Sequence, residues 1–252
     1  MDDIEATILK NRNIVSDYYL LKLRLSKPIG KVLPGQFVML KVPGNEVFLR
    51  RPFSVYDHDK NSLTLMYRVV GKGTRVLSNI KKNERTLVLG PLGNAFNVKR
   101  ADKHIVVAGG IGIAGVHTLI KKLGKKAHIF FGCNTREELP LIADILEFNP
   151  MVATLDGSIG FAGNVIELLQ GRIEPMMGKD TMIYACGPDG MVKSLRKMLE
   201  KHRTPCQVLV EERMACGLGL CFGCVIRTTD DAEPYKRVCK EGPVFDLWKI
   251  SL

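Results

Sequence analysis

Long apolar runs are missing from this sequence. The longest stretch without an acidic or basic residue is residues 104–120, and it contains four glycines. A membrane-spanning helix needs about 20 predominantly apolar residues, so this stretch is a poor candidate. The first residues, MDDIEATILK, also lack the basic-then-apolar layout of a secretory signal. We therefore expect a cytoplasmic protein with no membrane partner.

Cysteine is scarce and unevenly placed. The chain of 252 residues has seven cysteines, an odd number. A reducing compartment keeps thiols free, so we do not expect a disulfide framework.

The sequence shows no Ser/His/Asp set, paired carboxylates or other arrangement for general acid–base catalysis.

Acidic residues are fewer than basic ones. Lysine and arginine together number 37 against 26 for aspartate and glutamate, which gives a formal net charge of +11. Such an excess is compatible with nucleic acid, an anionic cofactor or an acidic partner. The lysines are scattered, however, with only short pairs such as Lys81 and Lys82. We interpret the charge as a solvated surface and predict no nucleic-acid partner.

The fold class follows from two contrasting patterns. IVSDYYLLKLRL, GQFVMLKV and NSLTLMYRVV alternate in hydropathy between turn residues, which predicts a small antiparallel β-barrel. From residue 101 apolar strands alternate with helices, which predicts a parallel α/β sheet with helices on both faces. One such helix, TREELPLIADILEF, is expected to begin with a capping box between Thr135 and Glu138. We predict three domains: residues 1–99, 100–209 and 210–252.

The last segment contains a cluster of cysteines in the pattern C-x4-C-x2-C-x14-C, from Cys216 to Cys239. The first three match the plant-type spacing for a [2Fe–2S] cluster. The glycines between them let backbone N–H groups approach the cluster sulfurs. A structural zinc site is the alternative, but zinc ligands usually come as two short pairs. We predict an iron–sulfur cluster, hence one-electron transfer.

Two stretches of the expected barrel suit a flavin nucleotide. RRPFSVYD offers the Arg51 guanidinium for a phosphate, the Ser54 hydroxyl, and the Tyr56 ring as a stacking face. Further on, YRVVGKGTRVLS places Gly73 and Thr74 where a helix is expected to begin, a suitable position for a pyrophosphate.

The α/β region carries a second nucleotide signal. VVAGGIGIAG follows an expected strand, opens a helix and contains G-x-G-x-x-G. The next strand ends in GCNTRE, without the acidic residue of a dinucleotide-binding Rossmann domain, so a generic dehydrogenase is not predicted. YACGPDG puts Cys186 at the carboxyl end of another strand, where ligands bind in such sheets. Cys133 and Cys206 are expected to be small buried apolar residues.

The order of these motifs carries a resemblance to a known family. R-P-F-S, G-x-G-T, G-P-L-G-N, G-G-I-G and C-G-P follow one another as in the ferredoxin reductase family of flavoproteins. With ERMACGLGLCFGC added, residues 5–246 resemble the electron-transfer subunits of B-type dihydroorotate dehydrogenases. The resemblance implies an FAD-binding barrel, then an NAD-binding α/β domain, then a [2Fe–2S] lobe.

The resemblance also implies roles for individual residues. Those expected to bind FAD are Arg51, Pro52, Phe53, Ser54, Met66, Tyr67, Arg68, Gly73 and Thr74. Those expected at the NADH pyrophosphate are Gly109, Gly110 and Gly112, with Cys186 near the nicotinamide. The cluster ligands would be Cys216, Cys221, Cys224 and Cys239.

By the same resemblance, electrons pass between NAD(H), FAD, the cluster and the FMN of a catalytic subunit, in pyrimidine biosynthesis. That subunit would hold the dihydroorotate site, in a heterotetramer of two copies of each chain. The alternatives are a subunit of a related NAD(P)H:ferredoxin or hydrogenase-linked reductase, and a zinc-stapled basic binding module. Gly115 stands where the family usually has proline, which weakens the argument that the nicotinamide binds in an identical way but leaves the flavin and cluster assignments intact. Arg136 stands where the 2′-phosphate of NADPH would bind, so the choice between NADH and NADPH stays open.

Overall fold

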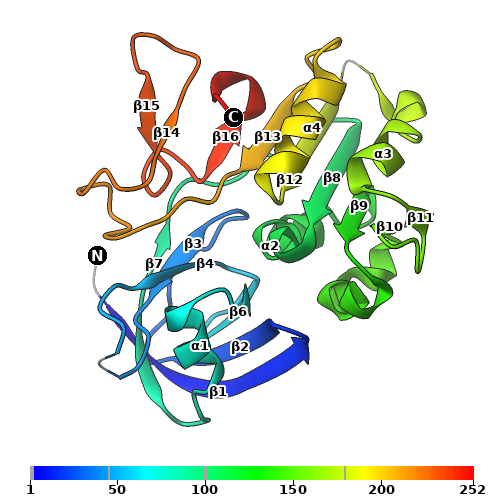
Figure 1. Cartoon of the computed structure of the whole chain (residues 1–252). Coiled ribbons are helices and arrows are strands. Elements are labelled where there is room, and N and C mark those ends of the chain that lie inside the picture. The colour runs from blue at the N-terminus through cyan, green and yellow to red at the C-terminus, as the bar shows by residue number, and fades with distance from the viewer. Residues whose placement is uncertain (1–2, 45, 99–100, 179) are drawn as a thin grey trace.

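The computed structural model describes residues 3–44, 46–98, 101–178 and 180–252. Its elements form an antiparallel barrel, a mainly parallel sheet with helices, and a C-terminal lobe (Figure 1). None of the helices in these ranges has the length and apolar content of a transmembrane segment.

The barrel is a seven-stranded antiparallel sheet in the order β4-β3-β7-β1-β2-β6-β5. Contact between β4 and β6 closes it. Alternate residues such as Leu21 and Leu23 fill one apolar core, to which Leu77 of the short helix α1 contributes. The antiparallel barrel is confirmed. Its elements are β1 (Ile4–Val15), β2 (Tyr18–Leu25), β3 (Phe37–Leu40), β4 (Arg51–Ser54), β5 (Asp57–Asp59), β6 (Ser62–Arg68), α1 (Lys72–Ser78) and β7 (Arg85–Leu92).

The second sheet has the order β11-β10-β9-β8-β12-β13-β16 and is parallel from β11 to β13. Its strands are β8 (Lys103–Gly109), β9 (Ala127–Cys133), β10 (Met151–Thr154), β11 (Phe161–Ala162), β12 (Thr181–Cys186), β13 (Cys206–Leu209) and β16 (Val244–Asp246). Its helices are α2 (Ile113–Leu123), α3 (Val165–Gln170) and α4 (Asp189–Leu199), with 3-10 helices η1 (Gly110–Gly112), η2 (Gly124–Lys126), η3 (Arg136–Phe148) and η4 (Glu174–Met176).

Helices cover both faces of this sheet, as predicted. Ile105 and Val107 pack with residues of α3 and α4, whereas Val106 and Ala108 pack with residues of α2 and η3. Burial on both faces explains why these strands are continuous apolar runs instead of alternating ones. The chain leaves β8 toward β9 and later returns to β12 on its other side. This reversal of strand order makes a crevice at the carboxyl ends of β8 and β12.

The C-terminal segment returns to the second sheet. Its β14 (Val225–Arg227) and β15 (Tyr235–Arg237) form a hairpin, and η5 (Leu247–Lys249) ends the described elements. Between them β16 pairs antiparallel with β13, so that Leu209 faces Val244. The sequence pattern did not predict this edge strand. The boundaries 1–99, 100–209 and 210–252 stay predictions.

The start of η3 differs from the expected capping box. The Thr135 hydroxyl accepts a hydrogen bond from the Glu137 N–H (3.2 Å), and the Glu138 carboxylate accepts one from the Asn134 side chain (2.8 Å). The reciprocal pairing of Thr135 with Glu138 was therefore wrong. Pro140 lies inside the segment, where its missing N–H and its ring disfavour an α-helix, and the segment is a 3-10 helix.

Candidate functional site

Two neighbouring cavities lie where the barrel meets the second sheet. The barrel cavity, of about 290 Å³, is lined mainly by β4, β6 and the segment after β13. The sheet cavity, of about 710 Å³, lies at the carboxyl ends of the parallel strands. Residues that line both are Arg68, Ile111, Leu209, Val210 and Glu211. The two cavities are therefore adjacent, and ligands bound in them would meet at these residues.

The barrel cavity gathers nearly all of the residues expected to bind FAD. Those in its lining are Arg51, Pro52, Phe53, Ser54, Met66, Tyr67, Arg68 and Thr74. Gly73 is the exception, because the Arg51 side chain lies over it. A Cβ atom at Gly73 would be 2.5 Å from Arg51 Nε. Glycine at this position therefore lets the guanidinium lie against the first turn of α1.

Polar contacts fix two of these side chains. The Thr74 hydroxyl accepts hydrogen bonds from the N–H groups of Val70 (3.0 Å) and Gly71 (3.2 Å), which shapes the turn into α1. Tyr67 donates its hydroxyl proton to Asn11 Oδ1 (3.1 Å). Burial raises the pKa of Tyr67 well above its ordinary value, so the phenol is neutral.

The sheet cavity is built around the turn from β8 into α2. Gly109, Gly110 and Gly112, the residues expected at the NADH pyrophosphate, line it together with residues 187–192 after β12. Their role in binding NADH stays a prediction. Gly110 has a φ of +51°, a left-handed conformation that favours glycine. A Cβ atom at Gly112 would lie 2.3 Å from the carbonyl oxygen of Cys186, so only glycine lets the two strand ends approach this closely.

Cys186 does not line either cavity. Its side chain is buried behind the wall, and burial raises the pKa of its thiol far above the ordinary range. A Cβ atom at Gly115 would lie 2.9 Å from Cys186 Sγ and 3.0 Å from Leu209 Cδ1. A side chain at position 115 would therefore displace both residues. A role for Cys186 near a nicotinamide stays a prediction.

Two carboxylates that the sequence patterns did not assign to a binding site also line the cavities. Glu138 lies in the wall of the sheet cavity, whereas Arg136 is absent from both linings. Glu211 lies at the junction of the two cavities, where its side chain is still exposed. Partial desolvation by the surrounding walls, followed by the negative charge of Asp189, raises the pKa of its carboxyl group. The sequence pattern pointed only weakly to Glu138 as a binding residue, because Glu138 lies in η3, several residues after the end of β9.

The four cysteines of the C-terminal cluster lie in two pairs. The thiols of Cys216 and Cys221 contact each other, and so do those of Cys224 and Cys239. In a [2Fe–2S] cluster held by four thiolates, each iron takes two of them, and two thiol pairs suit that arrangement. In the described ranges, no group of three His, Cys, Asp or Glu side chains is arranged around a single metal ion.

Backbone donors point at the cluster thiols. Leu218 N–H donates to Cys216 Sγ (3.4 Å), and Gly219 N–H donates to Cys239 Sγ (3.2 Å). Burial acts to raise the pKa of Cys216, but backbone hydrogen bonds outweigh it and lower this pKa to about 6. At Cys239, by contrast, burial and the neighbouring Cys224 thiol raise the pKa to about 12. Gly217 and Gly219, at φ values of +70° and +78°, turn the loop so that these N–H groups face inward. The loop therefore suits an anionic iron–sulfur cluster.

The cysteine loop and the barrel cavity share a wall. Met214 and Pro243, on either side of the cysteines in sequence, line the barrel cavity. Gly217 packs so closely on β3 that a Cβ atom there would be 2.6 Å from Met39 Cγ. A group held by the cysteines would therefore lie next to a group held in the barrel.

Comparison with known proteins agrees with this layout. The model of the oxidoreductase FAD-binding domain matches residues 5–96. The model of the iron-sulfur cluster binding domain of dihydroorotate dehydrogenase B matches residues 211–251. Among solved structures, the NADH-dependent reduced ferredoxin-NADP oxidoreductase superposes with a TM-score of 0.85 at 26% identity, covering 98% of this chain and 89% of that one. Phthalate dioxygenase reductase, at 16% identity and a TM-score of 0.67 over 94% of both chains, shares the fold.

Curated relatives extend over nearly the whole chain. The electron transfer subunit of dihydroorotate dehydrogenase B (NAD(+)) from Caldanaerobacter subterraneus subsp. tengcongensis is 36% identical, over 96% of both chains. The electron transfer subunit homolog from Aquifex aeolicus is 37% identical, over 99% of both chains. The chain belongs to the family of electron transfer subunits of dihydroorotate dehydrogenase B.

Proposed function

We propose that this chain is the electron transfer subunit of an NAD-dependent dihydroorotate dehydrogenase, an oxidoreductase of pyrimidine biosynthesis. One observation carries the proposal: a barrel cavity shares one wall with a nucleotide-type cavity and another with a loop of four paired cysteines. This arrangement suits a two-electron donor, a flavin and a one-electron carrier in sequence. FAD supplies the needed chemistry, because it takes a hydride and gives up electrons singly.

The residues of the barrel cavity would hold FAD. The Arg51 guanidinium, over the first turn of α1, would pair with its phosphates. Neutral Tyr67 and Met66 would pack on the ring system, next to Ser54. In the sheet cavity, the turn at Gly109, Gly110 and Gly112 would take the pyrophosphate of NADH. Cys186 would support this wall from behind.

The cysteine loop would pass electrons to a partner chain. Cys221 is exposed, and its neighbours Leu220 and Phe222 are 77% and 61% exposed. Apolar side chains this exposed next to a metal ligand suit a docking surface. We place there the catalytic subunit that holds FMN and the dihydroorotate site, in an assembly of two copies of each chain. Dihydroorotate oxidation would send electrons through this chain to NAD.

An absorption spectrum of anaerobically purified protein, before and after NADH, tests the proposal. We expect flavin bands and an iron–sulfur shoulder, both bleached by NADH. Colourless protein that contains zinc would overturn the proposal and favour the zinc-stapled binding module.

A second candidate function is an NAD(P)H:ferredoxin reductase subunit. The TM-score of 0.85 with the NADH-dependent reduced ferredoxin-NADP oxidoreductase favours it. The two functions are separated by mixing the purified chain with an FMN-containing dihydroorotate dehydrogenase subunit, dihydroorotate and NAD. Formation of NADH only when both chains are present supports the first function. Reduction of added ferredoxin by NADPH without that subunit supports the second.

A further inference from the structure

The G-P-L-G-N motif at residues 90–94 connects the barrel to the cysteine lobe. Asn94, just after β7, donates from its side chain to the carbonyl oxygens of Glu241 and Val244 (both 2.8 Å). Its side-chain oxygen accepts from the Val244 N–H (2.9 Å). Its own N–H donates to the Gly242 carbonyl (2.6 Å). Four hydrogen bonds from one residue thus hold the segment that follows the last cysteine, although Asn94 itself is exposed.

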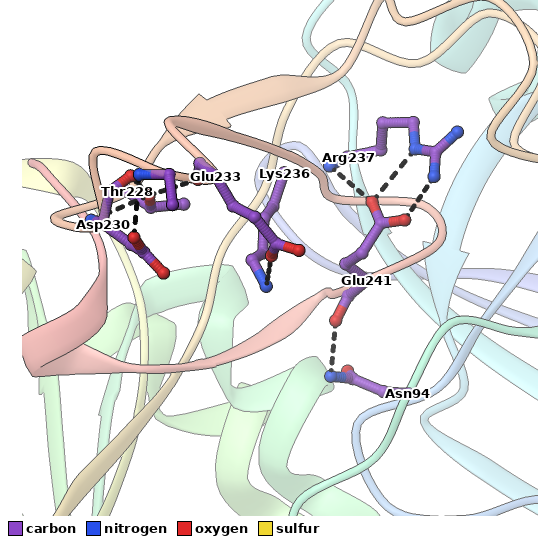
Figure 2. A network of polar contacts seen from close by, with 8 residues as sticks. Asn94, Thr228, Asp230, Glu233, Lys236, Arg237 and Glu241 are labelled. Carbon is purple, nitrogen blue, oxygen red and sulfur yellow. Dashed lines mark hydrogen bonds and ion pairs between the residues drawn. The ribbon is translucent and has the colours of Figure 1, made fainter.

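Glu241 extends this connection to Arg237, and Figure 2 shows the contacts of Glu241 with Asn94 and Arg237. Its carboxylate accepts from Arg237 Nε (3.0 Å), from Nη2, and from the Arg237 backbone N–H (2.8 Å). Arg237 Nη1 in turn donates to the carbonyl oxygen of Gly219 (2.7 Å). The N–H of that same Gly219 donates to Cys239 Sγ (3.2 Å). A continuous polar chain therefore runs from the barrel to a cluster ligand.

The same segment forms part of the barrel cavity wall. Pro243 lies four residues after Cys239 and lines the barrel cavity. It packs against Gly93, where a Cβ atom would be 2.5 Å from Pro243 Cδ. Residues 239–243 therefore join a cluster ligand to the flavin side, and Asn94 fixes this segment on the barrel.

We propose that Asn94, acting through Glu241 and Arg237, is a positioning residue that fixes the separation between the flavin and the cluster and so sets the rate of electron transfer between them. This inference rests on the proposed function.

The step concerned moves one electron at a time. With NADH as the donor, FAD in the barrel cavity would supply two electrons and release a proton to water, and a [2Fe–2S] cluster on the four cysteines would accept the electrons one at a time and pass each to the partner. Neither transfer breaks a bond in this chain, so the protein affects the rate through the distance and orientation at which it holds the two groups. Electron transfer through protein slows exponentially as the distance between the two groups grows, so a displacement of the cysteine lobe away from the barrel is enough to slow it.

The test compares Asn94→Ala with Gln207→Ala in the full-length protein carrying FAD and cluster. Gln207 is a matched control, because its side chain also makes two long-range hydrogen bonds, to the backbone N–H and carbonyl of Asn97 (both 2.8 Å). It ties the second sheet to the segment after the barrel instead of to the cysteine lobe. Stopped-flow absorption after mixing with NADH gives the rates of flavin and cluster reduction separately. Redox titration gives both midpoint potentials.

We expect Asn94→Ala to leave flavin reduction and both potentials unchanged and to slow cluster reduction several-fold, because the cysteine lobe is then held less closely to the barrel. Gln207→Ala should leave cluster reduction at the wild-type rate. Equal rates in the two variants would overturn the positioning role. If NADH fails to reduce the flavin of the wild-type protein, the proposed function fails instead.

If the Asn94→Ala variant loses its cluster, the Arg237→Lys variant tests the proposal in its place. Lysine keeps the positive charge near the cluster but lacks the planar fork that reaches both Glu241 and Gly219. Slower cluster reduction with unchanged iron content and unchanged potentials supports the positioning chain. A wild-type rate in this variant would contradict it.

Discussion

The rings of Tyr56 and His117 stack with their centroids 3.8 Å apart, across the boundary between the barrel and helix α2. His117 Nδ1 lies 2.7 Å from the Tyr56 carbonyl oxygen, so Nδ1 carries the proton. His117 Nε2 is buried without a hydrogen-bond partner among the described residues. The Tyr56 hydroxyl donates to Asp144 of η3 (3.1 Å). This contact joins the barrel to the second sheet through the side chain of His117.

Acid should weaken this boundary. Burial lowers the pKa of His117, with Lys121 acting in the same direction and the Tyr56 carbonyl, Asp57 and Asp144 opposing it. A histidine in an unfolded chain has a pKa of about 6.5, so below that pH the unfolded state binds the proton more readily. The contribution of neutral His117 to the free energy of unfolding is therefore fully present above about pH 6.5 and is lost as the pH falls below it.

His117→Phe keeps the ring stack but removes the titrating group. We expect its thermal midpoint to lie below that of the wild type at neutral pH, because it loses one hydrogen bond worth about 1 kcal/mol. Its midpoint should then change less between neutral and mildly acidic pH. Parallel pH profiles for the two proteins would exclude His117 as the acid-sensitive group, and exposed His128→Gln serves as the control.

Alanine at any one of the four clustered cysteines should abolish the cluster. Cys216, Cys221, Cys224 and Cys239 lie in contacting pairs, so removal of one leaves an iron with a single thiolate. We expect most of the iron and the electron paramagnetic resonance signal of the reduced cluster to disappear. Cys206→Ala is the control, since that thiol is buried on strand β13 of the second sheet and is not one of the four clustered cysteines. Iron lost equally from the Cys206 variant would contradict the assignment.

Glycine at position 93 is required by contact as well as by backbone conformation. Gly93 and Gly30 both have left-handed φ values, +73° and +87°. A Cβ atom at Gly93 would be 2.5 Å from Pro243 Cδ, whereas at Gly30 nothing lies within 4 Å. Alanine at either costs about 1–2 kcal/mol of backbone strain, and at Gly93 about 1–3 kcal/mol more for overpacking. Urea unfolding should show this difference, and equal losses would mean that the lobe shifts freely away from the barrel.

Local patterns predicted the parts of this protein better than their junctions. The C-x4-C-x2-C spacing predicted a thiol cluster, and the glycine turn after β8 lies in a cavity as expected, because both depend on residues close in sequence. The pairing of β16 with β13 depends on two segments that meet only in the folded chain. The contact of Asn94 with Glu241 is of the same kind, and the G-P-L-G-N motif carries no local sign of it. Cys186 shows the converse, because its place at a strand end did not reveal which way its side chain points.

The choice between NADH and NADPH should depend on Glu138. It lines the sheet cavity just beyond β9, and its Oε1 accepts from the Asn134 side chain (2.8 Å) while its Oε2 is buried without a hydrogen-bond partner in the described structure. An acidic side chain near the end of the second strand accepts ribose hydroxyls and repels a 2′-phosphate.

We therefore expect Glu138→Gln to raise kcat/KM for NADPH relative to NADH by about tenfold, or about 1.4 kcal/mol. The glutamine keeps an acceptor for Asn134 and removes only the charge, so folding should be unaffected. Arg136 is exposed and lies outside the cavity lining, so Arg136→Ala should leave the ratio unchanged. Steady-state reduction of an artificial acceptor with each nucleotide measures both ratios. If the ratio responds to Arg136 and not to Glu138, the 2′ position of the nucleotide lies beyond the cavity, on the outer face of η3.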